Sequence, residues 1–236
     1  TYADIFVKLT DVSNGTEDAS MSFRQISAGS LKEVVMQNGN VDFGDGSGIR
    51  LGDGNDFQLY HDGTDNHINV TNAQTLNIQT SGNNAIVVDA NGHITKPLQP
   101  AFSATASGQD DFAAGSLVQV GFSTEIFDQN ADYDTSNSSF TVPVTGKYQI
   151  NLGIRIKNVD QTAQYYVARI TTSNRVYDSI FNSSEFSSDL DFVWLSISAL
   201  ADMDASDSAT VHIYQSAGAA QTDIDTNSYF SGYLVA

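Results

Sequence analysis

The sequence predicts an all-β protein with two regions of different texture. Apolar and polar residues alternate with period two in segments such as TLNIQT (75–80), KYQINLGIRI (147–156) and ATVHIY (209–214), which is typical of strands with one buried face. No stretch keeps a helical apolar period over three turns, so no amphipathic helix is expected. We therefore expect an N-terminal β-shaft of short strand-turn repeats, intertwined from three chains, followed by a C-terminal β-sandwich head.

Residues 41–96 form the predicted trimeric shaft, and residues 1–40 form a shaft-proximal β segment. The apolar segments of the shaft are very short, for example Phe57 with Leu59. Turn-forming pairs separate them: Asp53-Gly54, Asp62-Gly63, Ser81-Gly82 and Asn91-Gly92. Strands with two or three apolar side chains cannot close a core within one chain, and isolated hairpins are marginal in water. Chains that wrap one another share a core, so we expect a homotrimer.

Residues 97–100 form a predicted hinge between the two regions. Pro97 and Pro100 remove donors from any strand ladder and stiffen the backbone. Beyond the hinge, residues 101–236 contain longer strands, nine of the 13 Phe residues and the only Trp, Trp194. This region has enough apolar residues to bury a conventional core.

The charge and composition restrict the possible functions. Ten basic and 28 acidic residues give a formal net charge of −18, and no cluster of Lys and Arg is present, so nucleic-acid binding is not expected. The absence of cysteine excludes disulfides and thiolate chemistry. No apolar run approaches the ~18 residues that span a bilayer, so membrane insertion is not expected. The abrupt start at TYADIFV indicates a fragment of a longer protein.

Two metal hypotheses arise in the stretch GDGSGIRLGDGNDFQLYHDG (44–63). Its GDGND segment is close to the nonapeptide that binds calcium in repeats-in-toxin rolls, but the two copies lie eight residues apart and no further copies follow, so they do not stack. His61 and His67 raise the second hypothesis, in which one imidazole from each chain meets a metal on a trimer axis. Plain turns are favoured over both, and no cofactor is expected.

No catalytic constellation is evident in the head. It contains one histidine, His212, and no Gly-x-Ser-x-Gly segment. Asp110-Asp111 or Asp202-x-Asp204 would imitate the carboxylate pair of a glycosidase, but acids in such Ser- and Ala-rich segments fit solvated loops better. We expect no enzyme activity. A weak polysaccharide hydrolase at a subunit interface stays open as an alternative, which release of reducing ends from host glycans would test.

Four motifs occur in order along the C-terminal half: PAFSA (100–104), NADYD (130–134) with FTVPVTGKYQI (140–150), YVARI (166–170) and YFSGYLV (229–235). With them this half resembles the globular domain of complement component 1, subcomponent q, and the related tumour-necrosis-factor-like jelly rolls. The resemblance implies a jelly-roll sandwich that assembles as a trimer around a three-fold axis. Within it we expect Phe140 and Tyr148 to pack inward, and Phe230 and Tyr233 to lie in the core as the last strand closes beside the first.

The N-terminal half shows a second resemblance. The segments IFVKLTDVSNGTEDASMSF (5–23), LGDGNDFQLYHDGTDNHI (51–68) and NGHITKPLQPAF (91–102) resemble parts of tail-fibre and related virion proteins from marine tailed bacteriophages. The LGD…QLYHDG piece, which recurs in fibre shafts, is the most specific of the three. The resemblance implies a location in the virion, other virion proteins as partners, and a role in attachment to the host.

Polar loops of the head are the candidate receptor-binding surface. They cover residues 157–166, 182–189 and 217–227, and supply these candidates: Tyr165, Asn182, Glu185, Gln221, Asp223 and Asn227. Strand alternation places at least one of the adjacent Tyr165 and Tyr166 in the core. The favoured function is attachment of a trimeric head to a glycan or protein of the host surface. The alternative is a purely structural trimerisation cap or a decoration of the particle.

Overall fold

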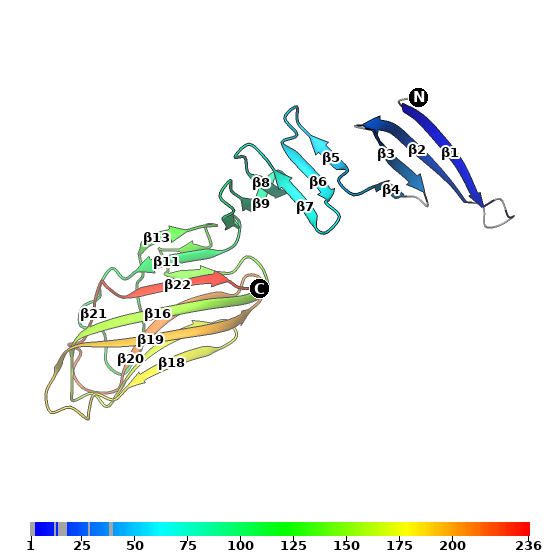
Figure 1. The fold of residues 1–236 in the computed structure, drawn as a ribbon. Helices are drawn as coiled ribbons and strands as arrows, with labels where there is room; N and C mark the ends of the chain where they lie inside the picture. Colours follow the sequence, from blue (N-terminus) through cyan, green and yellow to red (C-terminus); the bar gives the residue numbers. More distant parts are fainter. Residues whose placement is uncertain (1–2, 12, 14–17, 28, 38–39) are drawn as a thin grey trace. The chain divides into compact units, whose positions relative to one another are not determined.

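The computed structural model describes residues 3–11, 13, 18–27, 29–37 and 40–236, and within these ranges every regular element is a β-strand (Figure 1). The all-β prediction is therefore confirmed. The described residues divide into two compact units. The N-terminal unit comprises residues up to Ile78 together with Ile86–Thr95, and the C-terminal unit comprises Gln79–Ala85 together with Lys96–Ala236. The part of the chain that the structure describes contains no helix with the length and apolarity that crossing a bilayer requires.

The first sheet of the N-terminal unit has one apolar face. Its antiparallel strands lie in chain order: β1 (Ala3–Asp11), β2 (Asp18–Ser27), β3 (Ser30–Gln37) and β4 (Asn40–Phe43). Directly paired residues share a face, and Phe23 lies opposite both Ile5 and Val34. With alternation along each strand, the register gives the members of the β1–β4 apolar face: Ile5, Val7, Leu9, Met21, Phe23, Val34, Met36, Val41 and Phe43. Most of them are exposed in the single chain.

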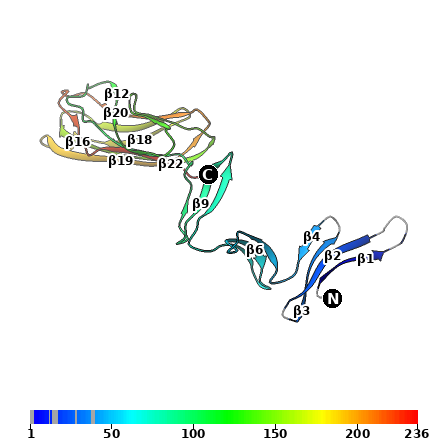
Figure 2. The same cartoon turned by 90° about the horizontal axis from the view of Figure 1, so that it is seen from above.

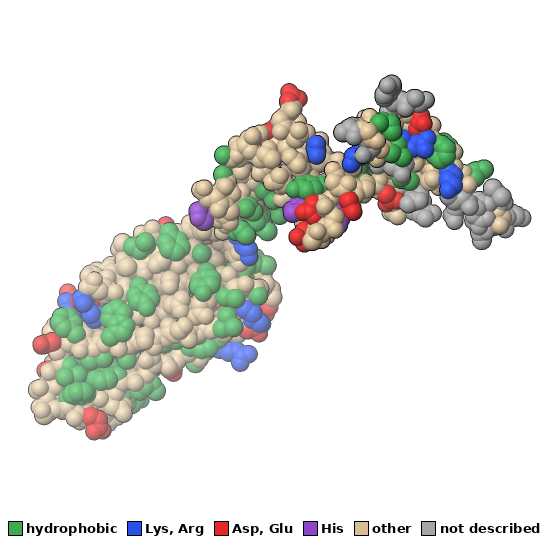
Figure 3. All heavy atoms as spheres, viewed as in Figure 1, with side chains coloured by type: hydrophobic (Ala, Val, Ile, Leu, Met, Phe, Trp, Pro, Cys, Tyr) green, Lys and Arg blue, Asp and Glu red, His purple; other side chains and the backbone are tan. Residues whose placement is uncertain are grey.

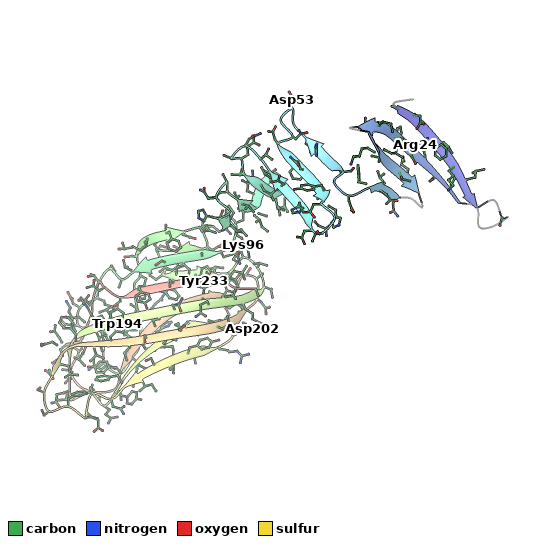
Figure 4. The ribbon with its side chains drawn as sticks, in the orientation of Figure 1. Arg24, Asp53, Lys96, Trp194, Asp202 and Tyr233 are labelled. Carbon is green, nitrogen blue, oxygen red and sulfur yellow. The ribbon has the colours of Figure 1, made fainter. Side chains whose placement is uncertain are left out.

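The opposite face of this sheet carries an ion pair that joins β1 to β2. Arg24 donates two hydrogen bonds to Asp4, from Nε to Oδ1 and from Nη2 to Oδ2, at 2.8 Å each (Arg24 is labelled in Figure 4). Its guanidinium lies 4.1 Å from the centre of the Phe6 ring. The sheet is therefore amphipathic, with the ion pair on one face and most of its aliphatic side chains on the other.

The second sheet repeats this amphipathic design. It contains β5 (Gly48–Leu51), β6 (Phe57–His61) and β7 (Asn66–Val70) in chain order. The register gives the members of the β5–β7 apolar face: Ile49, Leu51, Phe57, Leu59, Ile68 and Val70. On the other face the rings of Tyr60 and His67 stack with their centroids 4.7 Å apart.

A third sheet contains β8 (Leu76–Thr80), β9 (Asn83–Val88) and β10 (Ile94–Thr95), in the order β10-β9-β8. All four predicted turn pairs lie between strands, as expected. Ser81 and Gly82 form a two-residue hairpin loop in which both residues have positive φ, 50° and 81°. This backbone matches a type I′ turn, whose twist suits antiparallel strands and which favours glycine.

The C-terminal unit is a sandwich of two antiparallel sheets (Figures 1 and 2). The β16 sheet contains β13 (Thr124–Asp128), β11 (Ala101–Thr105), β22 (Tyr229–Leu234), β16 (Gly146–Val159) and β19 (Leu190–Met203) in that order, with β21 (Asp223–Ile224) beside β16. The β20 sheet contains β14 (Tyr133–Asp134), β15 (Ser139–Thr141), β20 (Ser208–Gln215), β17 (Tyr166–Thr172) and β18 (Val176–Phe181), with β12 (Leu117–Gln119) beside β20.

Aromatic side chains fill the core between the two sheets. The ring of Phe102, 1% exposed, contacts those of Tyr133, Phe140 and Phe230 at centroid distances of 4.6, 4.5 and 5.0 Å. Phe140, Tyr148 and Phe230 are all buried, as predicted, and β22 pairs with β11 so that the last strand lies beside the first.

The prediction of a core position for Tyr233 is wrong, because this side chain is 48% exposed. Successive residues of a strand point to opposite faces, so positions three apart cannot both point into the same core. Phe230 occupies the inward position of β22, and Tyr233 consequently lies on the outward face of the β16 sheet.

Candidate functional site

Aromatic and aliphatic side chains gather on the outward face of the β16 sheet (Figure 3). They belong to β13, β19 and β22 and are between 37% and 59% exposed. We call this surface the aromatic face; its members are Phe127, Phe192, Trp194, Leu200, Tyr229 and Tyr233. The intervening residues of β19, such as Leu195 and Ala201, point into the core. Strand β19 is therefore apolar on both faces over much of its length.

Gly153 makes room for the central aromatic pair of this face. The rings of Trp194 and Tyr229 lie against its backbone, with their centroids 6.1 Å apart. A Cβ atom at position 153 would lie 2.4 Å from Cε1 of Tyr229 and 2.6 Å from Cζ2 of Trp194, closer than such atoms can approach. The glycine thus allows both rings to lie low against the sheet and to form one continuous surface.

Charged groups at both ends of the aromatic face are paired. At the loop end, Arg155 donates from Nη2 to Oδ1 of Asp225 at 2.7 Å, and its guanidinium lies 5.1 Å from the centre of the Phe192 ring. The backbone N–H of Asn227 and the Arg155 guanidinium hold the pKa of Asp225 below its usual range. At the other end, Lys147 pairs with Asp202, which Figure 4 labels on β19.

Neutral polar groups occupy the middle of the same face. The Gln149 amide donates to Ser198 Oγ at 3.0 Å and to Asn151 Oδ1 at 3.1 Å. The aromatic face therefore combines exposed apolar area with charges that are neutralised at its edges. Such a surface is suited to burial against another protein surface, because few charged groups would lose water on contact.

The three polar loops singled out in the sequence meet at one end of the sandwich. They follow β16, β18 and β20, at the end of the C-terminal unit remote from the C-terminus (Figure 1). Asp189 joins them: its Oδ1 accepts from the Gln161 backbone N–H at 3.0 Å, and its Oδ2 accepts from the Gln221 amide at 2.9 Å. These hydrogen bonds hold the three loops together at one end of the sandwich.

A buried carboxylate links two of these loops by hydrogen bonds. Asp160 is 2% exposed, and it accepts hydrogen bonds from the backbone N–H and hydroxyl of Thr162 and from the backbone N–H of Ala219. Burial opposes ionisation of Asp160, but these hydrogen bonds outweigh it and hold its pKa below the usual range. Ser183 adds a link by donating to the carbonyl of Ala163 at 2.7 Å. These hydrogen bonds therefore hold the three loops in a defined arrangement.

The candidate receptor-binding residues differ in their exposure to solvent and in their contacts within the chain. Asn182 and Glu185 are exposed on the loop that follows β18. Gln221 is half-buried and is bonded to Asp189. Tyr165 lies outside the core, where its ring packs beside that of Tyr214, while the adjacent Tyr166 is buried.

The remaining two candidates serve the fold of the loops. Asp223 is 6% exposed, and its two oxygens accept from the Asp111 backbone N–H and the Asn158 amide, each at 2.8 Å. Asn227 donates from its backbone N–H and its amide to Asp225 Oδ1. Both side chains are therefore occupied with contacts inside the chain.

Several of the candidate metal and acid–base residues have other partners. His67 Nε2 lies 2.9 Å from Asp62 Oδ2, and His61 Nε2 lies 3.8 Å from Asp45 Oδ1. Among the residues that the structure describes, no three His, Asp or Glu side chains converge in a way that would hold a metal ion. Of the acidic pairs, Asp202 is engaged by Lys147.

Sequence reasoning missed the aromatic face. The signal was present in FVWLSIS (192–198), where apolar residues occupy both the odd and the even positions up to Leu195. A strand that is apolar on both sides indicates burial on both sides. In this structure only one of those sides is covered.

Comparisons with known proteins agree with this architecture. The family model of the C1q domain matches residues 101–235. The chain belongs to the C1q domain family. The match confirms the predicted jelly-roll head.

Solved structures with similar chains include two from vertebrates. The globular domain of the zebrafish complement 1qA protein has 18% sequence identity and a TM-score of 0.45, covering 58% of this chain and 98% of that chain. Murine APRIL, in a crystal structure at pH 8.0, has 10% identity and a TM-score of 0.44, covering 58% of this chain and 99% of that chain. The search of curated proteins gives no match.

Proposed function

We propose that three copies of this chain assemble through the aromatic faces of their C1q-type heads, and that the assembled head attaches a virion to a glycan or protein of the host surface. The observation that carries the assembly is the aromatic face itself. Exposed apolar side chains that gather on one face in this way mark interaction sites on soluble proteins. C1q and tumour-necrosis-factor-like domains form homotrimers and are often ligand- or receptor-binding modules.

The N-terminal unit supports an assembly of several chains. Its β1–β4 and β5–β7 apolar faces leave side chains such as Leu9 and Ile68 more than 60% exposed in the single chain. A sheet with one apolar face gains stability when a second apolar layer covers it. Three wrapped chains supply such layers to one another, which is the arrangement proposed for the shaft over residues 41–96.

Attachment of a virion to its host is the more specific part of the proposal. It is supported by the similarity of the segments 5–23, 51–68 and 91–102 to tail-fibre proteins. If the aromatic faces meet, the loop end and the outward face of the β20 sheet stay available on each of three heads. Three weak sites on one trimer bind a multivalent surface far more tightly than one. In this proposal the protein binds without catalysing a reaction.

The assembly is tested by the molar mass of the full chain in solution. Light scattering of the wild-type protein should give three times the chain mass of 25.3 kDa. Trp194→Glu places a carboxylate in the centre of each aromatic face, where burial without a partner is costly, and should weaken the trimer so that it dissociates at a higher protein concentration than the wild type. Phe186→Glu changes an aromatic residue that is 43% exposed but lies outside that face, and should leave the trimer intact. A monomeric wild-type protein would refute the assembly.

The attachment is tested with cells. The purified wild-type trimer should bind host cells, or extracts of their envelope, and should compete with intact virions for adsorption. If the trimer does not bind while intact virions do, the attachment role is wrong, and a structural trimerisation cap becomes the better description of the head.

A further inference from the structure

The outward face of the β20 sheet carries two adjacent rows of side chains with different chemistry. Its register places Leu117, Tyr214, Val167 and Ile180 side by side across β12, β20, β17 and β18. We call these four residues the tyrosine row. The residues two positions away from these on each strand form a second aligned set, which we call the polar row: Gln119, His212, Arg169 and Asp178.

The polar row carries hydrogen-bonding groups without net charge. Arg169 donates from Nε and Nη2 to the two oxygens of Asp178, at 2.7 and 2.8 Å, so that guanidinium and carboxylate neutralise each other. The Nδ1 atom of His212 lies 3.2 Å from the hydroxyl of Thr171. Burial and the nearby Arg169 charge lower the pKa of His212, so its ring is neutral at pH 7. The pair has exposed edges, because the two side chains are 30% and 29% accessible.

The tyrosine row offers aromatic and aliphatic surface beside these groups. The Tyr214 ring packs with that of Tyr165 at a centroid distance of 6.0 Å, with 39° between the ring planes. Leu117 and Ile180 stand at the two ends of the row with 47% and 64% exposure, and Val167 fills the floor between them. The row is therefore a shallow platform with an aromatic centre.

This combination matches the chemistry of a neutral sugar. A pyranose ring has an apolar face of C–H groups that packs on an aromatic ring, and a rim of hydroxyl groups that both donate and accept hydrogen bonds. Binding sites for small molecules commonly pair an aromatic surface with a few placed polar groups. An anionic ligand fits poorly, because Arg169 is already paired and the chain carries a net charge of −18.

We propose that this face binds a neutral saccharide, with Tyr165 and Tyr214 packing on a sugar ring and with Arg169, Asp178 and His212 forming hydrogen bonds to its hydroxyl groups. The inference names the ligand class of the attachment role and rests on that proposed function. It also moves the centre of recognition from the loop end, where most of the sequence-derived candidates lie, to the middle of a sheet. Of those candidates only Tyr165 belongs to the new site.

The test measures binding of the full-length protein to immobilised neutral gluco-, galacto- and manno-oligosaccharides, with heparin as the anionic comparison. The wild-type protein should bind at least one neutral series and should bind it in preference to heparin. Tyr165→Ala and Tyr214→Ala should each weaken that binding about tenfold, corresponding to about 1.4 kcal/mol. Tyr214→Phe keeps the ring and should bind within about threefold of the wild type. Phe186→Ala removes an exposed aromatic residue from the loop end and should bind like the wild type.

Each variant is first compared with the wild type for molar mass and thermal unfolding, so that a loss of binding is not a loss of fold. If no neutral saccharide binds, if heparin binds more tightly, or if both alanine variants bind normally, the saccharide site is wrong. Host-cell adsorption separates the two proposals. Normal adsorption by Tyr165→Ala and Tyr214→Ala overturns the site while the attachment role stands, whereas failure of the wild type to adsorb overturns the attachment role. If the molar mass of the wild type exceeds that of a trimer and Tyr214→Ala abolishes the excess, the occupant of this face is another copy of the chain. The proposal of a saccharide site would then be wrong.

Discussion

The N-terminal sheets and the C-terminal sandwich are built from the same alternating pattern, but only the sandwich buries its apolar side chains. In the sandwich, Phe102, Leu152 and Phe230 are at most 1% exposed, because the two sheets cover each other. In the N-terminal unit, Leu9 and Ile68 occupy equivalent one-sided positions and are 67% and 62% exposed. Among the residues before Pro100 whose burial the structure describes, Ser22 is the only one that is buried.

This difference shows what period-two alternation does and does not specify. Alternation fixes which face of a sheet is apolar, but it does not say what covers that face. In the sandwich the second layer comes from the same chain, and the aromatic face of the β16 sheet repeats the N-terminal situation in milder form. We infer that the uncovered faces of both units are completed by other copies of the chain.

The largest expected effect concerns the covered core. Phe102→Ala removes a ring that contacts three other aromatic rings, and it should lower the free energy of unfolding of the C-terminal unit by about 3–5 kcal/mol. Denaturant unfolding followed by Trp194 fluorescence measures this loss. Ile126→Ala, at a 62% exposed position of the same unit, should cost less than about 0.5 kcal/mol. Equal losses for the two variants would contradict the position of the core.

A smaller effect tests whether the N-terminal faces are covered by other chains. Ile68→Ser should cost little if the β5–β7 apolar face stays in water, but about 1–2 kcal/mol per chain if copies of the chain bury it. We expect the larger value, measured by hydrogen exchange of the β5–β7 amides in the full-length protein. Asn69→Ser changes the neighbouring residue on the opposite face of β7 and is the matched control. If the two variants behave alike, the shared core in the shaft does not exist.

Much of the fold could be predicted because it depends on local chemistry. Asp62-Gly63 and Ser81-Gly82 turn the chain where expected, since their backbone preferences act over a few residues. Phe140 and Tyr148 are core residues because alternation and motif agree at these positions. Tyr233 was misplaced because its motif suggested a core role while alternation, counted from Phe230, required the opposite face.

The candidate site was harder to predict, because it depends on contacts between distant residues. Asp223 looks like a free loop carboxylate in the sequence, yet Asp111 and Asn158 occupy both of its oxygens. Gly153 gives no sign in the sequence that two rings, from residues 194 and 229, lie against its backbone. Such features follow from strand register, which is established only when the sheets form.

The smallest expected effect concerns a turn that each chain sets by itself. In the Asp62 turn, Oδ1 accepts from the backbone N–H groups of Thr64 and Asp65 at 2.8 Å each, while Oδ2 lies 2.9 Å from His67 Nε2. The hydrogen bond from Asp65, with those from His67 and Thr64, holds the pKa of Asp62 well below its usual range. Because the folded pKa is depressed, the carboxylate stabilises the turn above the unfolded pKa of about 3.9, and this contribution is lost only as the pH falls through the folded value.

The Asp62 carboxyl signal, followed by NMR, should therefore titrate with a midpoint clearly below about 3.9. His67→Ala should raise the midpoint while leaving it below the usual value, since the two backbone donors remain. His93→Ala, which removes the corresponding partner of Asp89 in another turn, should leave the Asp62 midpoint unchanged. A wild-type midpoint at or above the usual value would show that the turn does not hold the carboxylate. If the midpoint is the same in the trimer and in the dissociated chain, each chain forms this turn by itself. Only the apolar faces of the N-terminal unit would then depend on other copies of the chain.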